Sequence, residues 1–305
     1  MRLSSAAAGG MLVLGLATAA WWGGLAASGA WRSRFLGPAG KFARDLAPFA
    51  APDLAILVPA ALAAAWAIAR RRPWARSAAW TATGATAYAA LATAALWSAE
   101  RLAALGALLM AAATLGSALA AWSLDWHPDR PFRVAAKSSR GADLAKTGIE
   151  TVVLWGLFLG IFPILIAATE RELGWDLLLP ASTRPLGWAL FAAASALGLW
   201  SGWTMTVAGE GTPLPRDTAR RLVVSGPYRW VRNPMTLAGL AQAIGVGAIL
   251  GSWGVVLYAL VGAAVWNHFA RPAEERDLAE RFGEPYERYR ATIPCWRPAR
   301  RPYRG

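Results

Sequence analysis

Long apolar stretches alternate with short charged segments along the chain of 305 residues. A helix needs about 20 mostly apolar residues to cross a hydrocarbon core of about 30 Å, and it satisfies its own backbone hydrogen bonds there. We therefore expect an all-α, polytopic transmembrane helical bundle with about eight spans, the last two forming a C-terminal helical hairpin. The stretches that meet this requirement are 6–28, 48–69, 78–97, 102–124, 149–169, 186–204, 234–250 and 253–270.

The lysines and arginines between these stretches predict the orientation of the chain. Basic loops are retained in the cytoplasm, and the bias favours an inner-membrane protein with both termini on the cytoplasmic side. The first external loop, with Arg32, Arg34, Lys41 and Arg44, is more basic than this rule favours. An alternative for the first span is a cleaved signal peptide. We prefer a retained helix because the apolar stretch is long and further spans follow it.

Composition narrows the partners that the chain is expected to have. Charged residues make up 16% of the sequence and the net charge is +13, with the basic excess in loops and in the tail after residue 270. This placement fits membrane lipids with anionic headgroups, and we expect no nucleic acid partner. With one cysteine, Cys295, and two histidines, His127 and His268, the chain offers too few ligands for a metal site, so we expect no metal.

A polar stretch with prolines and glycine, Asp125–Gly148, is the best candidate for a domain boundary. It divides an N-terminal four-span helical block of unknown role, residues 1–125, from a second domain, residues 126–305. The first block has alanine-rich helix faces but no residues that suggest chemistry. The chemistry-bearing motifs gather in residues 209–296 of the second domain.

Two turn signals flank the start of the seventh span. Gly226-Pro227 is one of them, and Asn233-Pro234 is the other, with Pro234 well placed as the first residue of a helix. The span itself carries small residues at intervals of four, which allow close approach either of a neighbouring helix or of a ligand. These small residues are Gly239, Ala243, Gly247 and Gly251.

Polar residues gather where the eighth span should emerge into the cytoplasm. Glu274 and Glu275 follow Pro272, and two interpretations stay open for them. Carboxylates are favoured in the first turn of a helix by its dipole. Alternatively, they bind a cationic ligand whose carboxylate pairs with nearby arginines such as Arg271. Asn267 and His268 just before them suit either hydrogen bonds between helices or ligand contact.

The end of the chain is aromatic and basic. Phe282-Gly283 is typical of a helix end with glycine just beyond it. Tyr286, Tyr289 and the arginines of the tail are expected at the membrane surface, where the segment would act as a lid or as a lipid-binding amphipathic piece.

Taken in order, these motifs resemble the isoprenylcysteine carboxyl methyltransferase and phospholipid methyltransferase family, whose members are integral membrane enzymes that use S-adenosyl-L-methionine. The similarity covers under a third of the chain, and no single element of it is specific. The elements are Gly226-Pro-Tyr-Arg, Arg232-Asn-Pro-Met, Gly245-Val-Gly247, Glu274-Glu275, Phe282-Gly-x-x-Tyr286 and Tyr289 before Ile293-Pro294.

The resemblance implies a methyltransferase that acts on a lipophilic or amphiphilic acceptor and binds its cofactor with the hairpin and its cytoplasmic flanks. It implies catalytic roles for Arg232, Asn233 and Glu275. Two departures weaken any inference about the acceptor, because the family usually has histidine at Asn233 and often has tyrosine at Thr236. The implied cofactor-binding residues are Tyr228, Pro234, Gly245, Gly247, His268, Arg271, Glu274 and Glu275.

Methyl transfer is an in-line displacement, so the enzyme mainly positions the acceptor against the methyl donor. Asn233 cannot act as a histidine base, and we therefore expect positioning and desolvation rather than base catalysis. Two alternatives remain. One is a steroid-type membrane reductase that uses NADPH, although the chain lacks the Asn-Tyr-x-x-Glu run expected there. The other is a non-catalytic membrane scaffold of the same fold.

Overall fold

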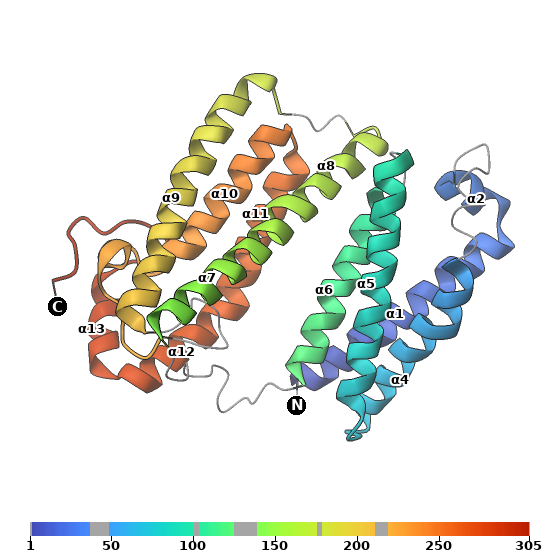
Figure 1. Cartoon of the computed structure of the whole chain (residues 1–305), viewed down its shortest axis with the longest axis horizontal. Coiled ribbons are helices and arrows are strands. Elements are labelled where there is room, and N and C mark those ends of the chain that lie inside the picture. Colours follow the sequence, from blue (N-terminus) through green and yellow to red (C-terminus); the bar gives the residue numbers. More distant parts are fainter. Residues whose placement is uncertain are drawn as a thin grey trace. The chain divides into compact units, whose positions relative to one another are not determined.

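The computed structural model describes residues 2–36, 49–100, 104–124, 139–175, 179–210 and 219–304, and within these ranges it contains helices and no strand. They form two compact units, residues 1–126 and 127–305 (Figure 1). The predicted boundary segment Asp125–Gly148 is described only from residue 139 onward. The roles that the sequence suggests for the two parts therefore stay predictions.

The predicted all-α membrane fold is confirmed, with the number of spans approximate. Two of the eight predicted spans do not meet the criteria of length and apolar character. The stretch 78–97 lies in a helix that is less apolar, and 234–250 forms a helix of 17 residues. The helices that are long and apolar enough to cross a membrane are Ser4–Ala27, Phe49–Ala69, Leu105–Ser123, Arg140–Glu172, Ala181–Gly209 and Trp253–Phe282.

The first unit is a bundle held together by alanine faces. Ala61, Ala64, Ala79 and Ala121 are completely buried, and such small side chains let helix backbones approach closely. The hydroxyl groups of Thr86 and Ser117 lie 3.2 Å apart between two of the helices. The elements of this unit are α1 (Arg2–Ala27), α2 (Gly29–Leu36), η1 (Asp53–Leu57), α4 (Val58–Ala69), α5 (Ala75–Glu100) and α6 (Ala104–Ser123).

The described part of the second unit contains three helices long and apolar enough to cross a membrane, the shorter helix Pro234–Leu250 and the short helix Glu284–Thr292 near the C-terminus. Large apolar side chains such as Val152, Leu186 and Phe269 are more than two thirds exposed, as expected for surfaces that face lipid. Its elements are α7 (Arg140–Trp155), η2 (Gly156–Ile161), α8 (Phe162–Glu172), η3 (Ala181–Thr183), α9 (Arg184–Gly209), η4 (Gly226–Arg229), α10 (Pro234–Leu250), α11 (Trp253–Val265), η5 (Trp266–Ala270), α12 (Arg271–Phe282) and α13 (Glu284–Thr292).

Glycines bring α10 into close contact with both of its neighbours. A Cβ atom at Gly245 would lie 2.9 Å from the carbonyl oxygen of Gly187 in α9, closer than side chains tolerate. A Cβ atom at Gly247 would lie 2.8 Å from a methyl group of Val256 in α11. The absence of side chains at these positions therefore sets the spacing of α9, α10 and α11.

A buried carboxylate fixes the turn at the far end of the α10–α11 hairpin. Glu170, at the end of α8, is 3% exposed and accepts hydrogen bonds from the Ser252 hydroxyl and, at 2.7 Å, from the Gly254 N–H. Ser252 in turn caps α11, because its oxygen accepts from the Val255 N–H at 3.0 Å. The hairpin is thus held at one end by these bonds and along its length by glycine contacts.

We predict that G245A lowers the stability of the protein and that G239A does not. The new methyl group at Gly245 must displace the α9 backbone, and overpacking of this kind costs about 1–3 kcal/mol. Nothing lies within 4 Å of a Cβ atom at Gly239 on the same helix, so this control variant gains the higher helix propensity of alanine without a clash. Thermal unfolding of both variants in detergent measures the difference, and equal melting temperatures would contradict the close α9–α10 packing.

Candidate functional site

The segment before α10 places two of the predicted residues at the start of that helix. Gly226 has a φ of +55°, and a Cβ atom there would lie 2.8 Å from the Thr204 hydroxyl, so the turn requires glycine. The 3₁₀ turn that follows leads to Asn233, which caps α10 by accepting the Thr236 N–H at 3.1 Å. Pro234 is the first residue of α10, as its sequence position predicts.

The helix of the eighth span does not end before Glu274, which corrects one of the two interpretations of this residue. Residues Trp253–Phe282 form one continuous helix, and the five residues 266–270 make a π-helical turn in it. Such a turn accommodates Pro272, which cannot donate a backbone hydrogen bond. The helix that carries Glu274 therefore has no N-terminus at this position, so its own dipole does not explain the two carboxylates.

The last part of this helix extends beyond the membrane. A helix of 30 residues is about 45 Å long, whereas the hydrocarbon core is about 30 Å thick. Seven of the 12 residues of α12 are charged, and the apolar part of the helix ends at Ala270. Glu274, Glu275 and their neighbours in α12 therefore lie outside the membrane-spanning segment, at its edge.

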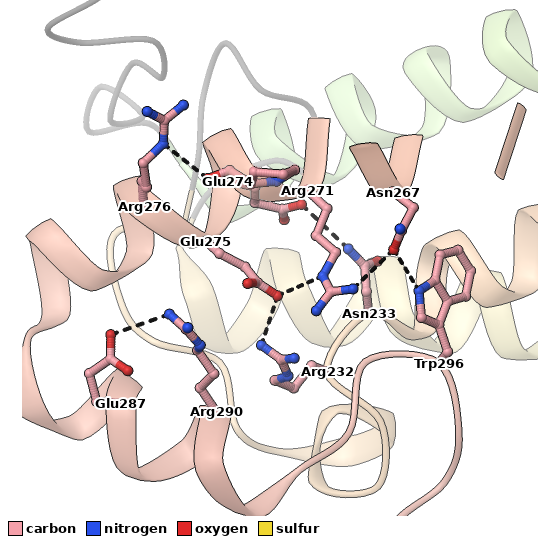
Figure 2. Close-up of polar contacts among 11 residues, drawn as sticks. Arg232, Asn233, Asn267, Arg271, Glu274, Glu275, Arg276, Glu287, Arg290 and Trp296 are labelled. Carbon is pink, nitrogen blue, oxygen red and sulfur yellow. Dashed lines mark hydrogen bonds and ion pairs between the residues drawn. The ribbon is translucent and has the colours of Figure 1, made fainter. Parts of the chain in front are cut away.

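Glu275 joins the loop before α10 to the helix α12. Its Oε1 accepts from the Nη1 of Arg232 at 2.9 Å and from the Nε of Arg271 at 2.8 Å (Figure 2). The side chains of Arg232 and Glu275 are only 11% and 18% exposed, so solvent screens this ion pair weakly. Arg232 also has a buried Nε for which no described residue provides a hydrogen-bond partner.

Asn267 extends the network by one helical turn. Its Oδ1 accepts from the Nη1 of Arg271 and from the indole Nε1 of Trp296, both at 2.9 Å (Figure 2). Asn267, Arg271 and Glu275 thus follow one another at intervals of four residues along one helix face. The implied set of site residues omits Asn267 and Trp296. The four-residue spacing could have revealed Asn267, but no sequence signal points to the contact from Trp296.

Glu274 is a carboxylate with few partners. Its Oε2 accepts from the Nδ2 of Asn233 at the long distance of 3.4 Å. Burial raises the pKa of Glu274 to about 7, and the negative charges of Glu275 and Asp277 add to this shift. The carboxyl group can therefore change its protonation state near neutral pH, and it has spare capacity to accept hydrogen bonds from a cationic ligand.

Three tyrosines lie near the charged residues of the site. Tyr228 is buried, and its carbonyl oxygen accepts from the Tyr289 hydroxyl at 2.6 Å. Burial raises the pKa of Tyr228, and the nearby carboxylate of Glu274 adds to the shift. Burial and Glu275 raise the pKa of Tyr286 to about 12. All three hydroxyls stay protonated at neutral pH, and that of Tyr289 donates to the Tyr228 carbonyl.

The remaining residues of the implied set lie apart from this network. Gly245 and Gly247 contact α9 and α11, as described above, and Gly245 is separated from Pro234 by three turns of α10. His268 is exposed, and its Nδ1 lies 2.8 Å from the carbonyl oxygen of Ala264 in its own helix. Helix packing accounts for the two glycines, and their implied contact with a cofactor stays a prediction.

We predict that E274Q changes the pH dependence of stability. The folded protein keeps the Glu274 proton up to about pH 7, whereas the unfolded chain loses it near 4.5. The folded state binds more protons between these values, so stability falls as the pH rises through them. At pH 8 the E274Q variant should be more stable than the original protein, by at most about 3 kcal/mol, and at pH 4 the two should be alike.

Melting temperatures in detergent between pH 4 and pH 8 test this expectation. The matched control is E284Q, because Glu284 is 81% exposed on the neighbouring helix α13. Parallel curves for E274Q and the original protein would show that the carboxyl group of Glu274 is not perturbed.

Comparison with known proteins identifies the region that contains the network. Residues 183–285 match the model of the phospholipid methyltransferase family. Protein-S-isoprenylcysteine O-methyltransferase of Schizosaccharomyces pombe is 33% identical over 82 residues, which are 26% of this chain and 34% of the relative. The match thus spans about a third of the relative's length. No solved structure shows a significant match to the chain.

The matched region extends from the start of α9 to α13 and includes both halves of the network. Among the described residues there is no group of three or more metal-binding side chains. The resemblance seen in the sequence motifs is confirmed by the match of residues 183–285 to the phospholipid methyltransferase family.

Proposed function

We propose that this protein is an integral membrane methyltransferase that uses S-adenosyl-L-methionine and acts on a lipophilic or amphiphilic acceptor. One observation carries the proposal. Residues 232–233 and residues 274–275 are about 40 residues apart in the sequence. They meet through the bonds of Arg232 with Glu275 and of Asn233 with Glu274. Both pairs lie within the region of the methyltransferase type.

The donors and acceptors of the network fit the polar groups of this cofactor. S-adenosyl-L-methionine carries a carboxylate, an ammonium group and a sulfonium. Arg271 and Arg232 offer N–H donors to a carboxylate. No described residue provides a hydrogen-bond partner for the Nε of Arg232, so this N–H can bind a ligand. The carboxylate of Glu274 accepts only a long hydrogen bond, from Asn233, so it can also accept from the ammonium group of the cofactor. The buried ring of Tyr228 lies near Glu274 and would line the same site.

The roles of the site residues follow from their contacts. Bound S-adenosyl-L-methionine supplies an activated methyl carbon, which an acceptor takes in line with the departing sulfur. Asn233 caps α10 and donates to Glu274, so it orients that carboxylate and removes no proton. Glu275 holds Arg232 and Arg271 in register. The site therefore positions the reactants and excludes water.

The acceptor should be one that needs no base. The network has two carboxylates that could act as a base: Glu275 already accepts from Arg232 and Arg271, and Glu274 is assigned here to the cofactor. An acceptor that is already anionic, such as a carboxylate on a lipophilic molecule, can be methylated without losing a proton. The relative's name, an O-methyltransferase, agrees with this choice. Access at the membrane edge suits an amphiphile.

The alternatives are a reductase that uses NADPH and a scaffold without activity. The neighbouring carboxylates of Glu274 and Glu275 repel the negatively charged phosphate groups of NADPH. The family comparison favours neither alternative. A scaffold of the same fold would bind neither cofactor.

We predict that the purified protein binds S-adenosyl-L-methionine and not NADPH, and that E275Q weakens this binding at least about thirtyfold. Removing one partner of a buried charge pair costs about 2 kcal/mol or more. Isothermal titration calorimetry measures the affinities, with E287Q on the exposed face of α13 as the control. Binding of NADPH would favour the reductase, and binding of neither cofactor would favour the scaffold.

We also predict that binding releases a proton near pH 6. Glu274 is mostly protonated there, because its pKa is about 7, and pairing with an ammonium group favours its ionised form. Affinity should rise by up to about tenfold per pH unit below pH 7 and level off above it. Calorimetry in two buffers of different ionisation enthalpy measures the proton release. Equal release by E274Q and the original protein would exclude Glu274 as the group that ionises.

A further inference from the structure

Residues 293–304, near the end of the chain, form a segment with buried and exposed side chains, here called the C-terminal strap. Its inward side chains are buried or partly buried against the loops and α13, among them Ile293, Cys295 and Tyr303. The strap contains no acidic residue. Its exposed outward side chains are Arg297, Arg300, Arg301 and Arg304.

Backbone hydrogen bonds attach the strap to the loop that carries Arg232. The Arg232 N–H donates to the Pro294 carbonyl at 3.0 Å, and the Ala299 N–H donates to the Trp230 carbonyl at 2.7 Å. The Tyr303 N–H donates to the Arg229 carbonyl at 2.9 Å. The strap is thus attached to the segment 229–232 at three points, through residues 294, 299 and 303.

A side chain of the strap also reaches the helix that carries Glu275. Trp296 donates to Asn267, which accepts in turn from Arg271, and its ring packs edge-on against Trp266 with 5.3 Å between the centroids (Figure 2). The strap is therefore in contact with both arginines that share Glu275, with Arg232 through its backbone and with Arg271 through Asn267.

We propose that the outer face of the C-terminal strap binds the anionic headgroups of the bilayer, and that this contact holds the loop 229–232 in place. The strap lies at the end of the second unit where the apolar part of the α11–α12 helix ends, which puts its arginines within reach of the headgroups. Trp230 beside it is 43% exposed, and indoles favour this interface.

The strength of the contact follows from the number of arginines. Each arginine close to an anionic membrane surface strengthens attachment about fivefold, and the strap exposes four of them. A soluble nucleic acid would also bind such a face, but the position of the strap at the end of a membrane helix favours lipid.

We predict that anionic lipid slows amide hydrogen exchange at Arg232, Ala299 and Tyr303, the residues whose N–H groups attach the strap. The full-length protein is compared in vesicles of phosphatidylcholine alone and of phosphatidylcholine with phosphatidylglycerol. We expect exchange to be at least about fivefold slower with phosphatidylglycerol, because the lipid opposes opening of the strap. High salt should remove the difference, because salt screens exposed charges.

Two sets of variants distinguish the effect of the strap's arginines from that of basic residues elsewhere in the chain. R297Q, R300Q, R301Q and R304Q combined should lose the lipid effect. The matched control with the same change in charge combines R70Q, R71Q and R72Q, in the loop between α4 and α5, with R76Q at the start of α5, and it should keep the effect. Equal exchange in both vesicle types would overturn the proposal, as would an equal slowing by short single-stranded RNA in phosphatidylcholine vesicles.

This measurement does not depend on the proposed function, because amide exchange needs neither cofactor nor methyl transfer. Slower exchange without any cofactor binding would support the strap and reject the methyltransferase. Cofactor binding together with equal amide exchange in both vesicle types would support the methyltransferase and reject the role of the strap.

Discussion

The site depends on one carboxylate, that of Glu275, which accepts hydrogen bonds from Arg232 and Arg271. Two arginines repel each other, and at the low exposure of this site neither is fully compensated by water. The shared carboxylate therefore favours contact between α12 and the loop that precedes α10. Because Arg232 keeps a buried Nε without a partner among the described residues, the network also retains a donor for a ligand.

The helices around this carboxylate are held in ways that leave little freedom at its position. Glu170 and Ser252 fix the far turn of the α10–α11 hairpin, and glycine contacts fix the distance between α9 and α10. At the near end, Asn233 caps α10 while donating to Glu274, so the same side chain that starts the helix also orients a carboxylate. A site for methyl transfer needs such rigidity, because the reaction depends on alignment.

Much of the fold could be predicted from the sequence, because apolar runs, turn signals and helix starts are local features. Asn233-Pro234 begins a helix and Phe282-Gly283 ends one, as their residue types indicate. The dipole interpretation of Glu274 was wrong because a π-helical turn lets the helix pass Pro272, and no local rule announces that turn. The spacing of α9 and α10 through Gly187 and Gly245 was equally hidden, since it depends on tertiary contact.

The meeting of the two motif halves is also tertiary, and only the resemblance to a family could anticipate it from the sequence. The contact of Trp296 with Asn267 has no such signal and emerged from the structure alone. The most direct test of the central claim is photo-cross-linking of radiolabelled S-adenosyl-L-methionine to the protein in membranes, followed by peptide mapping. Label on peptides from 226–236 or 267–282, displaced by excess unlabelled cofactor, is the expected result. Label confined to residues 1–126, or no displaceable label, would contradict a cofactor site at this network.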